Sequence, residues 1–155
     1  MTFRSARLWC GAADCSLALQ VHLETAGGRW VGIDARLRYH RADPYAVYFD
    51  THLELDEPVT WMFSRDILDD GLIRSGGEGD VTVRRCGDPW ALEIVLAGDG
   101  GPVVLQAPVT SVAGFLEATW EQVPPGSERD HLDLDRLLRA LLDGGGPSGD
   151  SGRAP

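Results

Sequence analysis

The sequence predicts an α+β domain in which antiparallel β-sheet carries three helices. Between residues 14 and 39, apolar and polar residues alternate, which is typical of strands with one buried face. Between residues 112 and 123, apolar residues recur at helical spacing instead. The predicted order is four strands, a helix, three strands and two helices, which gives about seven strands in all.

Turn signals separate the first four predicted strands. Ala26-Gly27-Gly28 joins the first two strands into a hairpin. Asp43-Pro44 turns the chain into the third strand, and Glu57-Pro58 turns it into the fourth, because Pro fixes φ and Asp bonds the backbone ahead of it. These strands are predicted over residues 14–24, 30–39, 45–55 and 59–63.

A short helix is predicted to follow over residues 64–70. Ser64 can cap its first turn and Gly71 is available to end it. Residues 76–80 are rich in glycine and are predicted to be a loop. Three more strands, ended by Pro108, are predicted over residues 81–85, 90–96 and 102–106.

The last two helices have the clearest periodicity. Thr110 or Ser111 is expected to cap the second helix, and Pro124-Pro125 to stop it. A third helix is predicted over residues 133–143, with Gly144 just past its end. Its apolar stripe consists of leucines, at positions Leu134, Leu137, Leu138, Leu141 and Leu142.

Composition indicates one domain with short flanking segments. Residues 1–12 form an unpatterned lead-in, residues 13–143 the domain, and residues 144–155 a tail that its Gly, Pro, Ser and Asp content predicts to be disordered. No apolar run approaches the ~20 residues of a membrane helix, and the N-terminus lacks a secretory apolar region. A cytoplasmic protein that is not integral to a membrane is therefore expected.

The net charge of −10 argues against non-specific nucleic-acid binding, which depends on cationic contacts to phosphate. The first 41 residues are the exception, with six Arg against three acidic residues. Arg36, Arg38 and Arg41 lie near two aromatic residues, Trp30 and Tyr39. Such a strip could stack and bind single-stranded nucleic acid, but core packing of the aromatic rings is the favoured interpretation.

No catalytic constellation and no cofactor site is predicted. His52, Glu54 and Asp56 would share one face of the predicted third strand and could hold a divalent metal, which keeps a metal-dependent enzyme as one hypothesis. A solvated polar face is the favoured interpretation. The glycines of residues 76–79 are not followed by the Lys of a phosphate-binding loop, and their acidic neighbours would repel phosphate.

The three cysteines are Cys10, Cys15 and Cys86. Their odd number and the absence of a signal peptide indicate reduced thiols. Their spacing is too open for a zinc site, so we expect each to be a small buried apolar residue and not a metal or redox centre.

Seven segments in one order resemble the SsgA-like family of actinomycete sporulation and cell-division proteins. The likeness covers roughly residues 14–142. The segments are Leu37-Arg38-Tyr39 leading to Ala42-Asp43-Pro44-Tyr45-Ala46-Val47, Trp61-x-Phe63-x-Arg65-Asp66-x-Leu68 with Gly71-Leu72, Gly79-Asp80-Val81-x-Val83, Leu105-x-Ala107-Pro108, Phe115-Leu116, Val123-Pro124-Pro125-Gly126-x-Glu128 and Asp133-Leu134-Asp135.

The resemblance implies a Whirly-like architecture and assembly as a homotrimer. It also implies a non-enzymatic adaptor that acts in the cytoplasm at the division septum, with FtsZ or another SsgA-like protein as partner. Whirly-like folds elsewhere bind single-stranded nucleic acid, which is the alternative function, although fold alone does not fix function. For partner contact we nominate Arg65 and Asp66 at the start of the short helix, together with Tyr39 and Tyr45.

Overall fold

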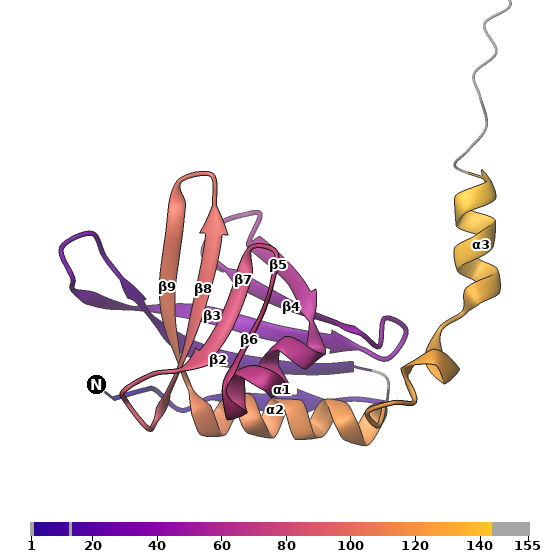
Figure 1. The fold of residues 1–155 in the computed structure, drawn as a ribbon, viewed down its shortest axis with the longest axis horizontal. Coiled ribbons are helices and arrows are strands. Elements are labelled where there is room, and N and C mark those ends of the chain that lie inside the picture. Colours follow the sequence, from indigo (N-terminus) through magenta and orange to yellow (C-terminus); the bar gives the residue numbers. More distant parts are fainter. Residues whose placement is uncertain (1, 13, 144–155) are drawn as a thin grey trace, which may run out of the picture.

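The computed structural model describes residues 2–12 and 14–143, and these form a curled, nine-stranded antiparallel sheet with three α-helices (Figure 1). The predicted α+β class is therefore confirmed. The strands are β1 (Arg7–Cys10), β2 (Asp14–Glu24), β3 (Trp30–His40), β4 (Ala46–Thr51), β5 (Val59–Ser64), β6 (Ser75–Glu78), β7 (Val81–Arg85), β8 (Ala91–Gly98) and β9 (Gly101–Pro108). The helices are α1 (Arg65–Ile73), α2 (Val109–Gln122), the short 3₁₀ helix η1 (Glu128–His131) and α3 (Leu134–Asp143).

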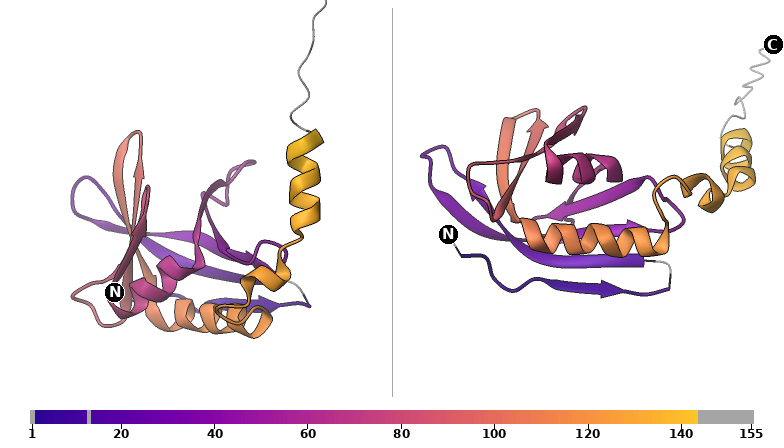
Figure 2. Two further views of the ribbon diagram at one scale, coloured as in Figure 1. Left: turned by 45° about the vertical axis from the view of Figure 1, so that its right-hand side comes forward. Right: turned by 60° about the horizontal axis from the view of Figure 1, so that its bottom comes forward.

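Strand β2 connects the two halves of the sheet. The order is β5-β4-β3-β2-β9-β8-β7-β6. β1 pairs with the same edge of β2 as β9 does, the edge that faces away from β3. β2 and β9 pair only at His22–Gln106 and Leu23–Leu105, so the halves diverge and the sheet curls. Helix α2 lies along the inner side of this curl and α1 lies against the second half (Figures 1 and 2). The core consists of the inward residues of both halves together with the buried stripe of α2.

The predicted β2–β3 hairpin is confirmed almost residue for residue. The strand predicted over residues 45–55 is wrong at both ends, because β4 spans only Ala46–Thr51. His52 has a φ of +55°, a left-handed conformation that ends the strand. Residues 52–58 are thus turn and bend, and only residues before them pair with β5.

Two strands were not predicted, β1 and β6. All four residues of β1 are exposed, so the lead-in shows no alternation of buried and exposed residues, although it pairs with β2. β6 occupies part of the predicted glycine-rich loop and pairs with β7. A Cβ on Gly76 would lie 2.6 Å from the carbonyl oxygen of Ile67, so glycine is needed where this strand passes α1.

The helices confirm some predicted boundaries and correct others. Ser64 caps α1 as predicted, accepting from the Asp66 N–H at 3.3 Å. Gly71 does not end α1; it lies inside the helix, where any Cβ would overlap the side chain of Val83. α2 begins at Val109 without a side-chain cap, so the predicted capping role of Thr110 or Ser111 is wrong.

The third helix matches its prediction within one residue. Gly144 and the predicted tail lie outside the described residues. Among the helices of the described ranges, none has the length and apolar character needed to cross a bilayer.

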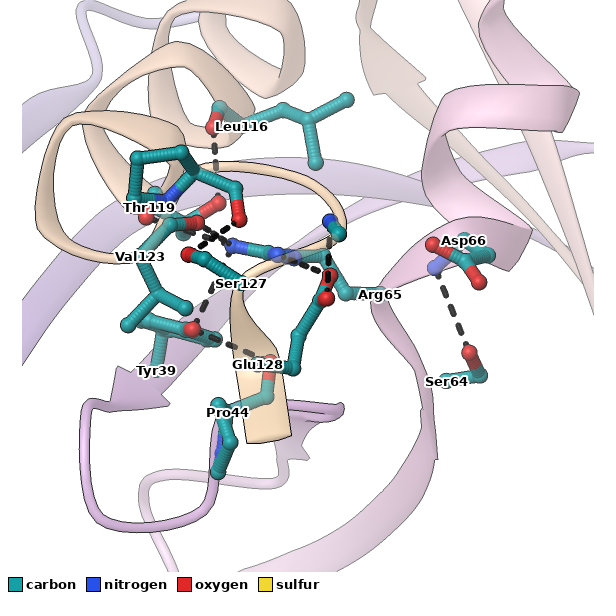
Figure 3. Close-up of polar contacts among 12 residues, drawn as sticks. Tyr39, Pro44, Ser64, Arg65, Asp66, Leu116, Thr119, Val123, Ser127 and Glu128 are labelled. Atoms are coloured by element: carbon teal, nitrogen blue, oxygen red, sulfur yellow. Dashed lines mark hydrogen bonds and ion pairs between the residues drawn. The ribbon is translucent and has the colours of Figure 1, made fainter. Parts of the chain in front are cut away.

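The first residue of α1 joins four parts of the chain through a buried guanidinium group (Figure 3). Arg65 is only 2% exposed. Its Nη1 donates to the carbonyl oxygens of Val123 at 2.7 Å and Thr119 at 3.2 Å at the end of α2, where the Thr119 carbonyl also accepts from the Val123 N–H. Its Nη2 donates to Glu128 Oε1 at 2.7 Å.

Tyr39 and Glu128 complete this network. Arg65 also donates to the hydroxyl of Tyr39 at 3.2 Å, and that hydroxyl donates to the Pro44 carbonyl at 3.0 Å. Burial raises the pKa of the Tyr39 phenol to about 12. Burial alone would raise the pKa of the Glu128 carboxyl, but hydrogen bonds from its own N–H, Arg65 and the Gly126 N–H hold it below its ordinary value.

Replacing Arg65 by Met should therefore lower the free energy of unfolding by about 3–5 kcal/mol, because Glu128 loses its buried counter-charge and two carbonyl groups each lose a charged donor. Asp66→Ala, one residue along, should cost less than about 1 kcal/mol, because Asp66 is exposed. Urea denaturation of both variants provides the measurement.

Adding Glu128→Gln to Arg65→Met should recover part of the loss in the free energy of unfolding, because the buried carboxylate without its counter-charge is then removed. Equal losses for Arg65→Met and Asp66→Ala would contradict this account of the network.

Candidate interaction surface

Two of the four residues nominated for partner contact are not at the surface. Arg65 and Tyr39 are 2% and 0% exposed, so their nomination is wrong. Both side chains point from their elements towards the end of α2 and are used in holding the fold together (Figure 3). Tyr45 is 42% exposed and Asp66 is exposed, so these two are accessible.

The polar cluster at residues 52–56 does not form on a strand face. His52 lies in the left-handed turn after β4, where its Nδ1 is 3.0 Å from the hydroxyl of Thr51. Glu54 and Asp56 follow in the irregular segment before β5. Across the described residues, no three His, Cys, Asp or Glu side chains gather in a way that could hold a metal ion. The predicted shared face is thus wrong, because β4 ends too early.

Two arginines of β3, Arg36 and Arg38, share one buried carboxylate. Asp50, 1% exposed, accepts from Arg38 Nε at 2.6 Å and Nη2 at 2.9 Å, and from Arg36 Nε at 3.0 Å. Thr60 adds a hydroxyl donor at 2.7 Å. The Arg38 guanidinium also lies 5.2 Å from the centroid of the Tyr48 ring. Arg38 is bound to Asp50 through two of its nitrogens, whereas Arg36, whose side chain is 42% exposed, is bound through Nε alone.

This cluster lowers the pKa of Asp50. Burial on its own would raise the pKa of the carboxyl, but the hydrogen bonds from Arg38, Thr60 and Arg36 outweigh it and bring the pKa down to about 2. Because the pKa in the unfolded chain is about 3.9, the ionised Asp50 stabilises the fold above that pH. The stabilisation is lost as the pH falls through about 2.

Asp50→Asn should accordingly reduce the free energy of unfolding by about 2 kcal/mol near neutral pH. The difference from the unchanged chain should shrink as the pH falls from about 4 to about 2. Denaturant titrations over this pH range provide the measurement, with Asp34→Asn on the neighbouring strand β3 as an exposed control. A difference that does not vary with pH would contradict the assignment of this carboxylate.

Helix α3 presents the largest group of exposed leucines in the described chain. It projects from the body of the domain in every view, and none of its residues is buried (Figures 1 and 2). Spacings of three and four residues place the leucines on one face. This leucine face consists of Leu134, Leu137, Leu138, Leu141 and Leu142, which are 50–78% exposed.

The polar side of α3 and its start are well defined. Arg136, Arg139 and Asp143 lie opposite the leucine face, by the angular spacing of a helix. The Asp133 carboxylate accepts from the Arg136 N–H at 2.9 Å and so caps the helix. Before the helix, Arg41 Nε donates to His131 Nδ1 at 3.1 Å. The helix is therefore attached at its start and uncovered along its length.

An apolar hollow of about 310 Å³ lies between the two halves of the sheet. Its walls come from β2, β3, β4, β5, β8 and β9, and His52, just after β4, also lines it. Apolar residues dominate the lining: Leu23, Ile33, Val59, Trp61, Leu96, Pro102, Val103 and Leu105. An apolar side chain of a partner could fill it, so it is a second element of the candidate surface.

Sequence reasoning identified the leucine stripe of α3 but did not nominate it as a contact surface. The helical period is the same for a covered and an uncovered stripe. The sequence feature that could have indicated an uncovered stripe is the polar, proline-containing segment of residues 124–133, which separates α3 from the rest of the domain. The hollow could not be found from sequence, because its walls come from six strands.

Comparison with known proteins confirms the predicted resemblance. Residues 33–128 match the family described as Streptomyces sporulation and cell division protein, SsgA. The sporulation-specific cell division protein SsgB of Streptomyces coelicolor is 39% identical over 129 residues, covering 82% of this chain and 94% of that protein. SsgB of Thermobifida fusca is 40% identical over 114 residues, covering 72% of this chain and 83% of that protein.

Solved structures agree with the sequence matches. The crystal structure of an SsgA-like sporulation-specific cell division protein from Thermobifida fusca superposes with a TM-score of 0.74 at 33% identity, covering 86% of this chain and all (100%) of that one. A structure from work on SsgB mutations that correlate with longitudinal cell division during sporulation of Streptomyces coelicolor gives a TM-score of 0.67 at 37% identity, covering 77% and 94% of the two chains. The chain therefore belongs to the SsgA family of sporulation and cell division proteins.

Proposed function

We propose that this chain is a non-enzymatic adaptor in sporulation-specific cell division that acts in the cytoplasm at the septum. The observation that carries the proposal is the leucine face of α3, which is apolar, contiguous and uncovered. Contiguous exposed apolar surface is typical of protein–protein contact sites. The names of the SsgB relatives support a role in cell division.

The partner we propose is FtsZ or another SsgA-like protein, bound by the leucine face. An amphipathic helix that lays its apolar side into a groove is a recurrent mode of recognition. Burying one leucine completely contributes about 1.5–3 kcal/mol. Since about 1.4 kcal/mol corresponds to a tenfold change in affinity, two central leucines should alter binding strongly.

The variant Leu138→Gln/Leu141→Gln should weaken binding to purified FtsZ or the sister SsgA-like protein at least about tenfold. Co-sedimentation with FtsZ polymers and titration calorimetry with the sister protein provide the measurements. Both leucines are more than half exposed, so the fold should not depend on them.

The matched control is Arg136→Gln/Arg139→Gln, which changes the polar side of the same helix by the same number of residues. Circular dichroism of both variants checks that α3 stays helical. The adaptor proposal fails if the unchanged chain binds neither protein. Equal weakening by the two double variants would instead remove the leucine face as the binding surface.

Assembly as a homotrimer is a second part of the proposal. The open apolar hollow between the halves of the sheet offers a surface that an adjacent copy could cover. Light scattering coupled to gel filtration should give three times the mass of one chain. Trp61→Gln, which makes the hollow wall more polar, should shift the protein towards smaller species. A monomeric mass for the unchanged chain would contradict the trimer.

Nucleic-acid binding is not proposed. The arginines that suggested it, Arg36 and Arg38, form a cluster with Asp50, and the nearby aromatic residue Tyr39 is buried. Their positive charge is partly offset by this carboxylate, and the net charge of the chain is −10.

A further inference from the structure

Cys10 and Cys15 lie directly opposite each other on neighbouring strands. β1 and β2 are antiparallel, and their register pairs Cys10 with Cys15. The two Sγ atoms are 3.0 Å apart, with the Cys10 thiol donating to Cys15. Both side chains are thus turned to the same side of the two strands, with nothing between the sulfur atoms.

Strand geometry places the two backbones at a suitable separation for a covalent bond. The Gly11 N–H donates to the Asp14 carbonyl at 2.9 Å, so the pair beside the cysteines is a hydrogen-bonded one. Pairs alternate along an antiparallel ladder, and Cys10–Cys15 is therefore a non-hydrogen-bonded pair, whose Cα atoms are typically about 4.5 Å apart. Disulfides accept Cα separations of about 4.4–6.8 Å.

The two thiols differ in access. Cys10 is exposed, whereas Cys15 is 1% exposed in the core under α2. Burial, followed by the contact with Cys10, raises the pKa of the Cys15 thiol to about 12. Cys10 therefore does not fit the expectation of a buried apolar cysteine, whereas Cys15 does. An oxidant in solution reaches Cys10 first.

Gln122 holds the connection between the strands in place. Its Nε2 donates to the carbonyl oxygens of Gly11 at 3.0 Å and Asp14 at 3.1 Å. The end of α2 thereby fixes the backbone on both sides of the connection, and the cysteine side chains keep their facing positions.

We propose that Cys10 and Cys15 are a modification site, a dithiol that closes reversibly to a disulfide by exchange with a low-molecular-weight disulfide. The Cys10 thiolate attacks one sulfur of that disulfide, which forms a mixed disulfide and expels the first small thiol. Cys15 Sγ then loses its proton to water, attacks Cys10 Sγ and expels the second small thiol. The protein loses two electrons and two protons, and the small disulfide gains them.

The closed form ties β1 to the sheet. All four β1 residues are exposed, and β1 has no strand on its other edge in the described structure. The loop between the cysteines is short, so the disulfide adds little to the stability of the whole domain. Its effect is local: it prevents β1 from separating from β2, and it fixes the position of exposed Trp9 beside the bond.

The test uses the full chain carrying Cys86→Ala, so that only the pair is present. Oxidised glutathione is added to the folded protein, and intact mass and free thiols are followed with time. We expect both thiols to disappear, the mass to fall by two hydrogens, and reduction by dithiothreitol to restore them. Hydrogen exchange at residues 7–10 should slow upon oxidation, while exchange in α3 stays unchanged.

Two single variants separate the roles of the cysteines. Cys15→Ala should accumulate the glutathione adduct on Cys10, and Cys10→Ala should react at least about tenfold more slowly, because its remaining thiol is buried. Cys15→Ala keeps an apolar side chain at the buried position, so the fold is retained. A stable glutathione adduct on the chain with both cysteines, or disulfide-linked dimers in place of the internal bond, would overturn the proposal.

Discussion

The arrangement of the helices depends on the buried guanidinium group of Arg65. A buried cation is costly in free energy unless every donor meets an acceptor. The acceptors here belong to the end of α2, to η1 and to β3, so the charge is satisfied only when all three lie against α1. The Glu128 carboxylate is also largely buried, so it in turn needs hydrogen-bond donors and a positive partner. This relative placement of the elements satisfies both ions, and a shifted α2 would deprive Arg65 of the Thr119 and Val123 carbonyl acceptors.

The alternation of apolar and polar residues along the sequence predicted those elements that have one buried and one exposed face. The β2–β3 hairpin has one buried and one exposed face, so alternation was visible, and α2 has a buried stripe at helical spacing. β1 and β6 have neither property. β1 is exposed throughout, and Gly76 of β6 is required by the proximity of α1 to that strand, which no local pattern records. The two strands that were not predicted are therefore those that form only by pairing with a neighbouring strand and show no pattern of their own in the sequence.

The predictions for individual site residues held where the property was local in sequence and failed where it depended on a distant partner. Ser64 and Asp66 were correctly placed at a helix start, because capping is a local property. The direction of Arg65 was not predictable, since its carboxylate partner lies sixty-three residues further along the chain. Asp50 is likewise brought to Arg36 and Arg38 only by the β3–β4 register. In each case the residue types were informative, but the partner was set by tertiary structure.

The Arg65–Glu128 ion pair lies where the packed part of the chain ends. Glu128 is the last buried residue before α3, and beyond it the leucine face contributes nothing to the core. An isolated helix of ten residues is marginal in water, because nucleation costs more than a few hydrogen bonds return. A partner that covers the leucines would therefore gain apolar burial and also order the helix that presents them. On the proposed function, the packed domain would serve as a fixed support, and burial of the uncovered leucines would supply free energy for binding the partner.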